Sequence, residues 1–284
     1  MNINAVNIEM ASHVDVINAF LDSRNDGFHI EYRDIPKSGG YMPAYVIRTQ
    51  TSMASPVIYG DTIGKIGTLP ELADYLEDVY RNSSLDIDET VLSGSYVLQH
   101  VMPHVASAEK AAYYRKEGYT TIDFLDMVIT FAIEIEGDRF YLLRDETMIH
   151  AGIRIDQVAD AAIKHLESRY SIHKMADIVP YPDDEGGVPL FIVSTDFDGA
   201  SYGASVLISE KIMSAAAEQL NDDLVVFPSS VHEILIVPRE FAGALCDCSS
   251  LVRDVNETCV RPEDQLTNHA YLWLRNEKRL TVID

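Results

Sequence analysis

The chain has 284 residues, with 22 Lys or Arg against 45 Asp or Glu, and its formal net charge is −23 at pH 7. This length is enough for one large or two ordinary domains, and 47% hydrophobic residues can fill a sizeable core, which excludes a small scaffold held by disulfides or metal. Proteins grip phosphate groups with Lys and Arg, so this composition argues against direct binding of nucleic acid or anionic lipid.

The same sequence indicates a soluble, cytoplasmic protein. Its longest apolar runs, such as residues 204–208 and 234–237, are far shorter than the ~20 residues of a membrane-spanning helix. A secretory signal would begin with basic residues, but none precedes Arg24. The cysteines are Cys246, Cys248 and Cys259, an odd number that fits free thiols in a reducing compartment.

In chain order, hydrophobic spacing first predicts an amphipathic helix over residues 6–21. Three short strands follow, at residues 28–32, 44–49 and 56–59. Thr68 and Glu71 stand three residues apart, as in a capping box, and predict the start of a helix that continues to Asn82.

The middle of the chain predicts an extended segment, a helix, a hairpin and a second helix, at residues 96–105, 107–117, 125–143 and 156–170. This regular pattern ends at a segment rich in Pro, Gly and acidic residues. We therefore expect residues 171–188 to link an N-terminal lobe, residues 1–170, to a C-terminal lobe, residues 189–284.

In the C-terminal lobe, strands are expected at residues 190–195, 203–208, 224–227, 231–237, 271–275 and 279–283. Helices are expected at residues 209–220 and 247–258. Strand pairs that alternate with single helices predict an α+β fold in two lobes, with antiparallel sheets and helices packed on one face of each sheet.

Residues 228–233 contain the residue types of an acyl-transfer site. Ser229 or Ser230 could act as the nucleophile and His232 as its base, with Glu257 as the carboxylate. Strand alternation from residue 231 would, however, direct His232 and Glu233 to opposite faces. A tight turn followed by a hydrogen-bonded core histidine is the interpretation we favour, and a hydrolase-like enzyme is the alternative.

Two sets of potential metal ligands have unsuitable spacing. His100 and His104 lie in a segment predicted to be extended, which would separate their rings by about 13 Å. The three cysteines and His269 could supply four ligands, but the helix predicted between Cys248 and Cys259 would hold those thiols about 16 Å apart. We expect no metal and no cofactor.

The strongest charge bias lies in residues 175–238, which contain eleven acidic residues and one basic residue. An acidic surface there could attract a basic partner protein, and our candidate contacts are Asp183, Asp184, Asp222 and Asp223. Ordinary solvation of an acidic protein would explain the same bias. A nucleic-acid mimic is a further alternative, and it would require rows of carboxylates with the ~7 Å spacing of phosphates along a strand.

Three C-terminal segments are distinctive, namely DLVVFPSSVHE at residues 223–233, VNETCVRPEDQL at residues 255–266 and the strand pair at residues 271–283. Together they resemble an uncharacterised bacterial family, domain of unknown function 5688. The resemblance implies no activity, cofactor or catalytic residue, but it places Asn256 and Glu257 in one lobe with residues 228–233. The function we predict is that of an acidic binding or accessory protein that acts through protein contact without catalysis.

Overall fold

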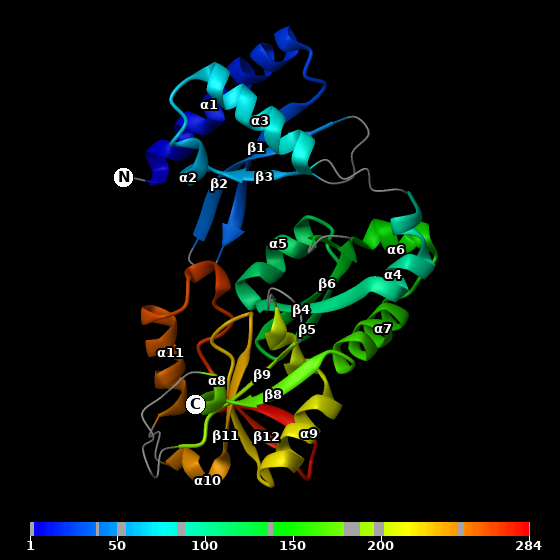
Figure 1. Cartoon of the computed structure of the whole chain (residues 1–284), viewed down its shortest axis with the longest axis vertical. Coiled ribbons are helices and arrows are strands. Elements are labelled where there is room, and N and C mark those ends of the chain that lie inside the picture. The colour runs from blue at the N-terminus through cyan, green and yellow to red at the C-terminus, as the bar shows by residue number, and fades with distance from the viewer. Residues whose placement is uncertain are drawn as a thin grey trace. The chain divides into compact units, whose positions relative to one another are not determined.

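The computed structural model describes residues 3–37, 40–49, 55–83, 89–135, 139–178, 188–195, 202–243 and 247–283. Helices combine with antiparallel sheets, which confirms the predicted α+β class (Figure 1). The chain forms two compact units, unit 1 at residues 1–91 and unit 2 at residues 92–284.

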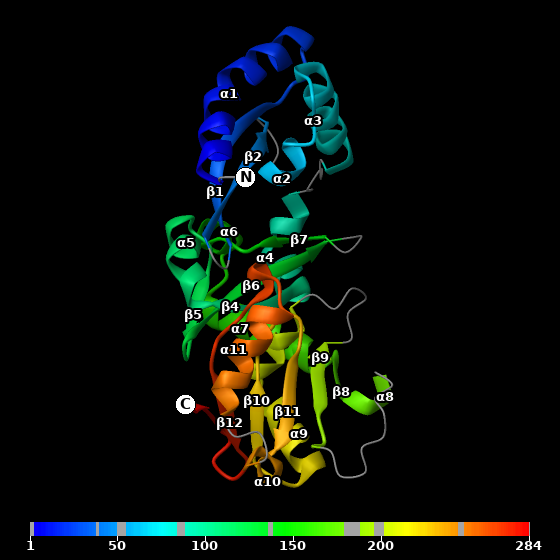
Figure 2. The same cartoon turned by 90° about the vertical axis from the view of Figure 1, so that its left-hand side faces the viewer.

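This division does not coincide with the linker expected at residues 171–188. Residues 171–174 of the expected linker belong to strand β8 (Tyr170–Lys174), which pairs antiparallel with β9 (Phe191–Thr195), so one sheet includes the start of this segment and the strand just after it (Figure 2). Composition suggested a boundary because Pro and Gly interrupt the pattern there, but a loop between two paired strands has the same composition.

Unit 1 consists of α1 (Ile3–Arg24), β1 (His29–Lys37), β2 (Gly40–Arg48), β3 (Val57–Tyr59), α2 (Gly60–Ile63) and α3 (Leu69–Ser83), with its strands in the order β1-β2-β3. The buried side chains of its core include Leu21, Ile30, Tyr45, Ile47 and Leu76. The Asn18 side chain joins α1 to β1, because it accepts from the Ile30 N–H at 2.8 Å and donates to the Ile30 carbonyl at 2.9 Å. The Thr68 hydroxyl accepts from the Glu71 N–H, so this half of the predicted capping box is present.

Unit 2 contains a four-stranded and a six-stranded antiparallel sheet. In the first, β6 (Met127–Ile135) pairs with β4 (Val101–Ser107), β5 (Thr121–Phe124) and β7 (Arg139–Leu142). The second has the order β13-β12-β10-β11-β9-β8 and adds β10 (Leu224–Phe227), β11 (Ile234–Pro238), β12 (Ala270–Leu274) and β13 (Arg279–Ile283).

The helices of unit 2 are α4 (Gly94–His100), α5 (Ala111–Lys116), α6 (Asp145–Ala151), α7 (Ile155–Glu167), α8 (Met175–Ile178), α9 (Glu210–Leu220), α10 (Arg239–Ala242) and α11 (Cys248–Thr258). The short 3-10 helices are η1 (Glu89–Leu92), which begins before the unit boundary, η2 (Ala108–Lys110), η3 (Gly203–Ile208) and η5 (Pro262–Asp264). No helix in the described ranges combines the length and the apolar character that a membrane span requires.

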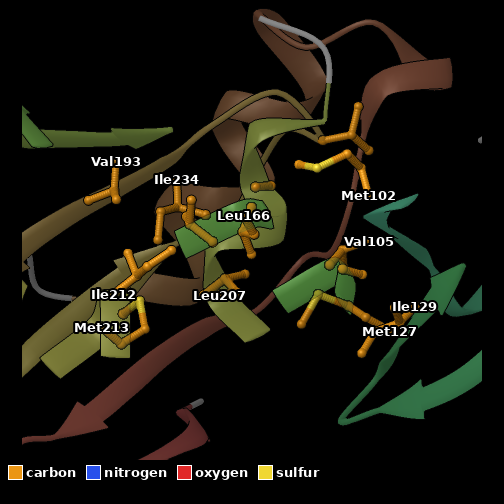
Figure 3. Close-up of a cluster of buried hydrophobic side chains, with 14 of the residues drawn as sticks. Met102, Val105, Met127, Ile129, Leu166, Val193, Leu207, Ile212, Met213 and Ile234 are labelled. Atoms are coloured by element: carbon orange, nitrogen blue, oxygen red, sulfur yellow. The ribbon is translucent and has the colours of Figure 1, made fainter. Parts of the chain in front are cut away.

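One hydrophobic core joins the two sheets of unit 2 (Figure 3). It combines side chains of the four-stranded sheet, the six-stranded sheet, η3 and the helices α7 and α9, among them Met102, Ile129, Leu166, Val193, Leu207, Ile212 and Ile234. On the other face of the six-stranded sheet, Val225 and Val237 pack against Val252 of α11. Helices thus cover both faces of this sheet (Figure 1), although we had expected one.

Residues 96–100 and 203–208 differ from the predicted secondary structure. Residues 96–100 are helical because the Ser93 hydroxyl accepts from the Tyr96 N–H and starts α4, so β4 begins only at Val101. Residues 203–208 form the 3-10 helix η3 rather than a strand. This segment is almost wholly buried between the sheets, and a uniformly apolar run lacks the alternation that identifies a strand.

Candidate functional site

His232 lies in a bend between β10 and β11 and not within a strand, because β11 begins at Ile234. The Ser230 hydroxyl accepts from the His232 N–H at 3.0 Å, and the Val231 N–H donates to the Asp264 carbonyl at 2.9 Å. These bonds close a turn, so the alternation that we predicted for His232 and Glu233 does not apply.

The candidate nucleophiles belong to the turn. Both Ser229 and Ser230 are buried. The Ser230 hydroxyl donates to the carboxylate of Glu233 while it accepts from the backbone of His232. A serine nucleophile instead needs its hydroxyl directed at an imidazole and at a substrate.

The carboxylate beside His232 is Asp264, whose Oδ1 lies 3.5 Å from the imidazole Nε2. Glu257, the carboxylate chosen from the sequence, is exposed on the last turn of α11. Its neighbour Asn256 faces the interior and donates its side-chain amide to the Thr267 carbonyl at 2.9 Å. Because successive helical residues point about 100° apart, Glu257 lies off this inward face.

Aromatic rings from three separate segments meet next to His232. The His104 and Tyr202 rings are stacked, with centroids 3.9 Å apart and an interplanar angle of 10°. The Phe140 ring meets both of them edge-on, at 5.0 and 5.6 Å, and the His232 ring lies 6.4 Å from Tyr202. Tyr202 has a left-handed backbone with φ of 68°, which is unusual for a bulky residue and shows that the surroundings fix its position.

Burial sets the charges in this cluster of His104, Phe140, Tyr202, His232 and Asp264, which we call the His232 cluster. Burial lowers the pKa of His104 to about 3, so its imidazole is neutral at physiological pH. Burial also raises the pKa of the neighbouring Glu233 carboxyl, and the nearby His232 and the Ser230 hydroxyl oppose this rise. Glu233 therefore holds a proton more tightly than an exposed glutamate does.

The acidic residues proposed as partner contacts make internal bonds where the structure describes them. Asp222 accepts from the Glu240 N–H at 2.9 Å. Asp223 pairs with Arg239 at 3.0 Å and accepts from the Arg275 N–H at 2.9 Å, which ties the ends of β10, β11 and β12 together. Asp183 and Asp184 lie outside the described residues.

The potential metal ligands are not gathered. His100 Nδ1 lies 2.9 Å from the Tyr96 carbonyl, and Cys248 and Cys259 are free thiols. Cys246 falls outside the described residues. Across the described part of the chain, no three His, Cys, Asp or Glu side chains are placed to hold a metal ion.

Sequence reasoning selected His232 but missed Asp264 and the rings around it. Asp264 is 32 residues from His232 along the chain, and His104 is 98 residues from Tyr202. No local motif connects positions so far apart, and only the packing of the two sheets on a shared core brings them together.

Comparison with known proteins identifies a family that includes most of the chain. A family model described as a family of unknown function, DUF5688, matches residues 13–275. The chain belongs to this family. No curated protein and no solved structure matches the chain. The match includes every residue of the His232 cluster, and the family description gives no activity.

Proposed function

We propose that the protein is a cytoplasmic binding or accessory protein that acts through contact with a basic partner protein, without catalysis by Ser229 or Ser230. The observation that carries this proposal is the His232 cluster, in which the Asp264 carboxylate lies 3.5 Å from the His232 imidazole and the His232 ring lies 6.4 Å from the Tyr202 ring. Phe140 is 42% exposed, and the side chains of His232 and Asp264 are 33% and 29% exposed. A ligand can therefore reach them.

A carboxylate next to aromatic faces suits a cationic side chain. The carboxylate forms charge-assisted hydrogen bonds, and the rings attract the same cation through their π-electrons. Arginine fits better than lysine because its planar guanidinium both stacks on rings and donates two parallel hydrogen bonds. The net charge of −23 would also speed the approach of a basic partner.

The Ser230 contacts favour binding over acyl transfer, because this hydroxyl stabilises the turn through Glu233 and the His232 N–H. The free thiols of Cys248 and Cys259 support a cytoplasmic location. The hydrolase-like enzyme stays an alternative hypothesis, and so does the nucleic-acid mimic.

The test measures binding of a short arginine-containing peptide by calorimetry, with matched lysine and glutamate peptides for comparison. Asp264→Asn should weaken arginine-peptide binding about fivefold to tenfold, the value of one charge-assisted contact near 1 kcal/mol. Glu218→Gln is the control, because it removes one exposed charge from α9, outside the cluster. If Asp264→Asn and Glu218→Gln lose equal affinity for the arginine peptide, general charge attraction explains the binding and the site is refuted.

A further inference from the structure

A second group of polar side chains in unit 2 surrounds Asp126, which follows β5 in the turn to β6. Its carboxylate accepts from His269 Nδ1 at 2.7 Å, from the Thr267 hydroxyl at 2.9 Å and from the Tyr271 hydroxyl. The three donors belong to β12 and the segment before it. Leu125, which has a left-handed φ of 53°, turns the chain so that Asp126 meets them.

This network fixes the proton on the His269 ring. Burial raises the pKa of the Asp126 carboxyl, but hydrogen bonds from Tyr271, His269 and Thr267 together lower it below its usual value. Asp126 is therefore ionised at neutral pH and can only accept, so Nδ1 of His269 carries the proton. In the neutral imidazole, Nε2 is then the atom with a free lone pair, and 43% of the side chain is exposed.

The neighbouring hydroxyl groups of Thr267 and Tyr271 already form hydrogen bonds within the network. The Thr267 hydroxyl donates to Asp126 and accepts from the backbone N–H of His269 at 3.2 Å. Burial and the adjacent Asp126 raise the pKa of Tyr271, so its hydroxyl keeps its proton and donates to the carboxylate. Any proton that Nε2 accepts must come from outside this network, from a water molecule or from a bound ligand.

We propose that His269 is a general base, with Asp126 as its positioning residue, that activates water for hydrolysis of a neutral or cationic carboxylic ester. A carboxylate that orients the imidazole and leaves Nε2 as the acceptor is the arrangement such catalysis requires. The ester is neutral or cationic because a protein with a net charge of −23 repels anions. This site shares no residue with the His232 cluster and does not depend on the function proposed there.

The reaction balances without a cofactor. A water molecule gives one proton to Nε2 as its oxygen attacks the carbonyl carbon of the ester. The bond between this carbon and the alcohol oxygen then breaks, and the leaving alcohol takes the proton back from the imidazolium. The products are a carboxylic acid and an alcohol, and the imidazole is restored.

The experiment follows cleavage of p-nitrophenyl acetate, a neutral ester, by the full chain. His269→Gln keeps a side-chain N–H that can donate to Asp126 but lacks the basic imidazole nitrogen, and should reduce cleavage about tenfold or more. His150→Gln replaces an exposed histidine of α6 and should cleave like the wild type. Equal rates for the two variants would overturn the proposal.

Nitrogen NMR of the His269 ring tests the role of Asp126. The wild type should show a protonated Nδ1 and an unprotonated Nε2, and Asp126→Asn should shift the proton toward Nε2 and slow ester cleavage. A contact that only holds the fold would shift the tautomer in that variant without slowing ester cleavage, and that result would contradict the role of Asp126. Tryptophan fluorescence verifies folding, and should His269→Gln unfold, the wild-type tautomer decides, since a protonated Nε2 refutes the base.

Discussion

His104 should make unit 2 sensitive to mild acid. Its ring is buried against Tyr202 and Phe140, and burial lowers its pKa to about 3. In the unfolded chain the same imidazole titrates near its ordinary pKa of about 6.5. Below that pH the unfolded state binds a proton that the folded state does not, so stability falls as the pH falls from about 6.5 toward 3.

The size of the effect follows from these two pKa values. Between pH 7.5 and pH 5, His104 alone should remove about 2 kcal/mol from the free energy of unfolding. Phenylalanine can replace the ring and keep its contacts with Tyr202 and Phe140 without binding a proton. His104→Phe should therefore lose about 2 kcal/mol less than the wild type over the same range.

Urea unfolding followed by the fluorescence of Trp273 measures this difference. Trp273 is the single tryptophan of the chain and is buried in β12, so its signal reports on unit 2. The free energy of unfolding is compared between wild type and His104→Phe at both pH values, and the contributions of the other histidines cancel in this difference. If His104→Phe loses as much free energy of unfolding as the wild type between pH 7.5 and pH 5, the buried, neutral His104 ring is refuted.

Three further outcomes are expected. Gly203→Ala should destabilise unit 2 by about 1 to 3 kcal/mol in urea unfolding, because its Cβ would lie 2.2 Å from the His232 carbonyl, whereas Gly243→Ala, with nothing within 4 Å, should be neutral. Asn18→Ala should cost unit 1 about 1 to 3 kcal/mol by leaving the two backbone groups it binds without this partner, and amide hydrogen exchange in β1 should accelerate. Asp126→Asn should flatten the stability curve below about pH 4, because the lowered pKa of Asp126 gives stability that is lost as the pH falls through it; an unchanged curve would contradict the network.

Local physical rules were enough for most elements of this protein. The helix α3 was predictable because its apolar residues recur at helical spacing after Thr68, and the hairpin β6–β7 because branched residues flank a short polar stretch of sequence. Such signals arise within a few residues and need no distant partner. The negative charge and the absence of a long apolar run are likewise properties of the sequence itself.

Burial changed the outcome where the local pattern was ambiguous. Residues 203–208 are apolar at almost every position, so a strand and a 3-10 helix fit the sequence equally well. The structure selects the 3-10 helix, and the close approach of Gly203 to the His232 carbonyl leaves no room for a side chain. Ser230 was likewise named as a nucleophile from its type, whereas its contacts make it part of a turn.

The sequence by itself determined the fold class, most helices and strands and the acidic character, because spacing, capping and charge act over short distances. Tertiary structure decided the partners. His232 faces Asp264 and not Glu257, and His269 binds Asp126 from 143 residues away. These side chains meet because strands pair and sheets pack across a shared core, and no local sequence motif predicts such long-range contacts.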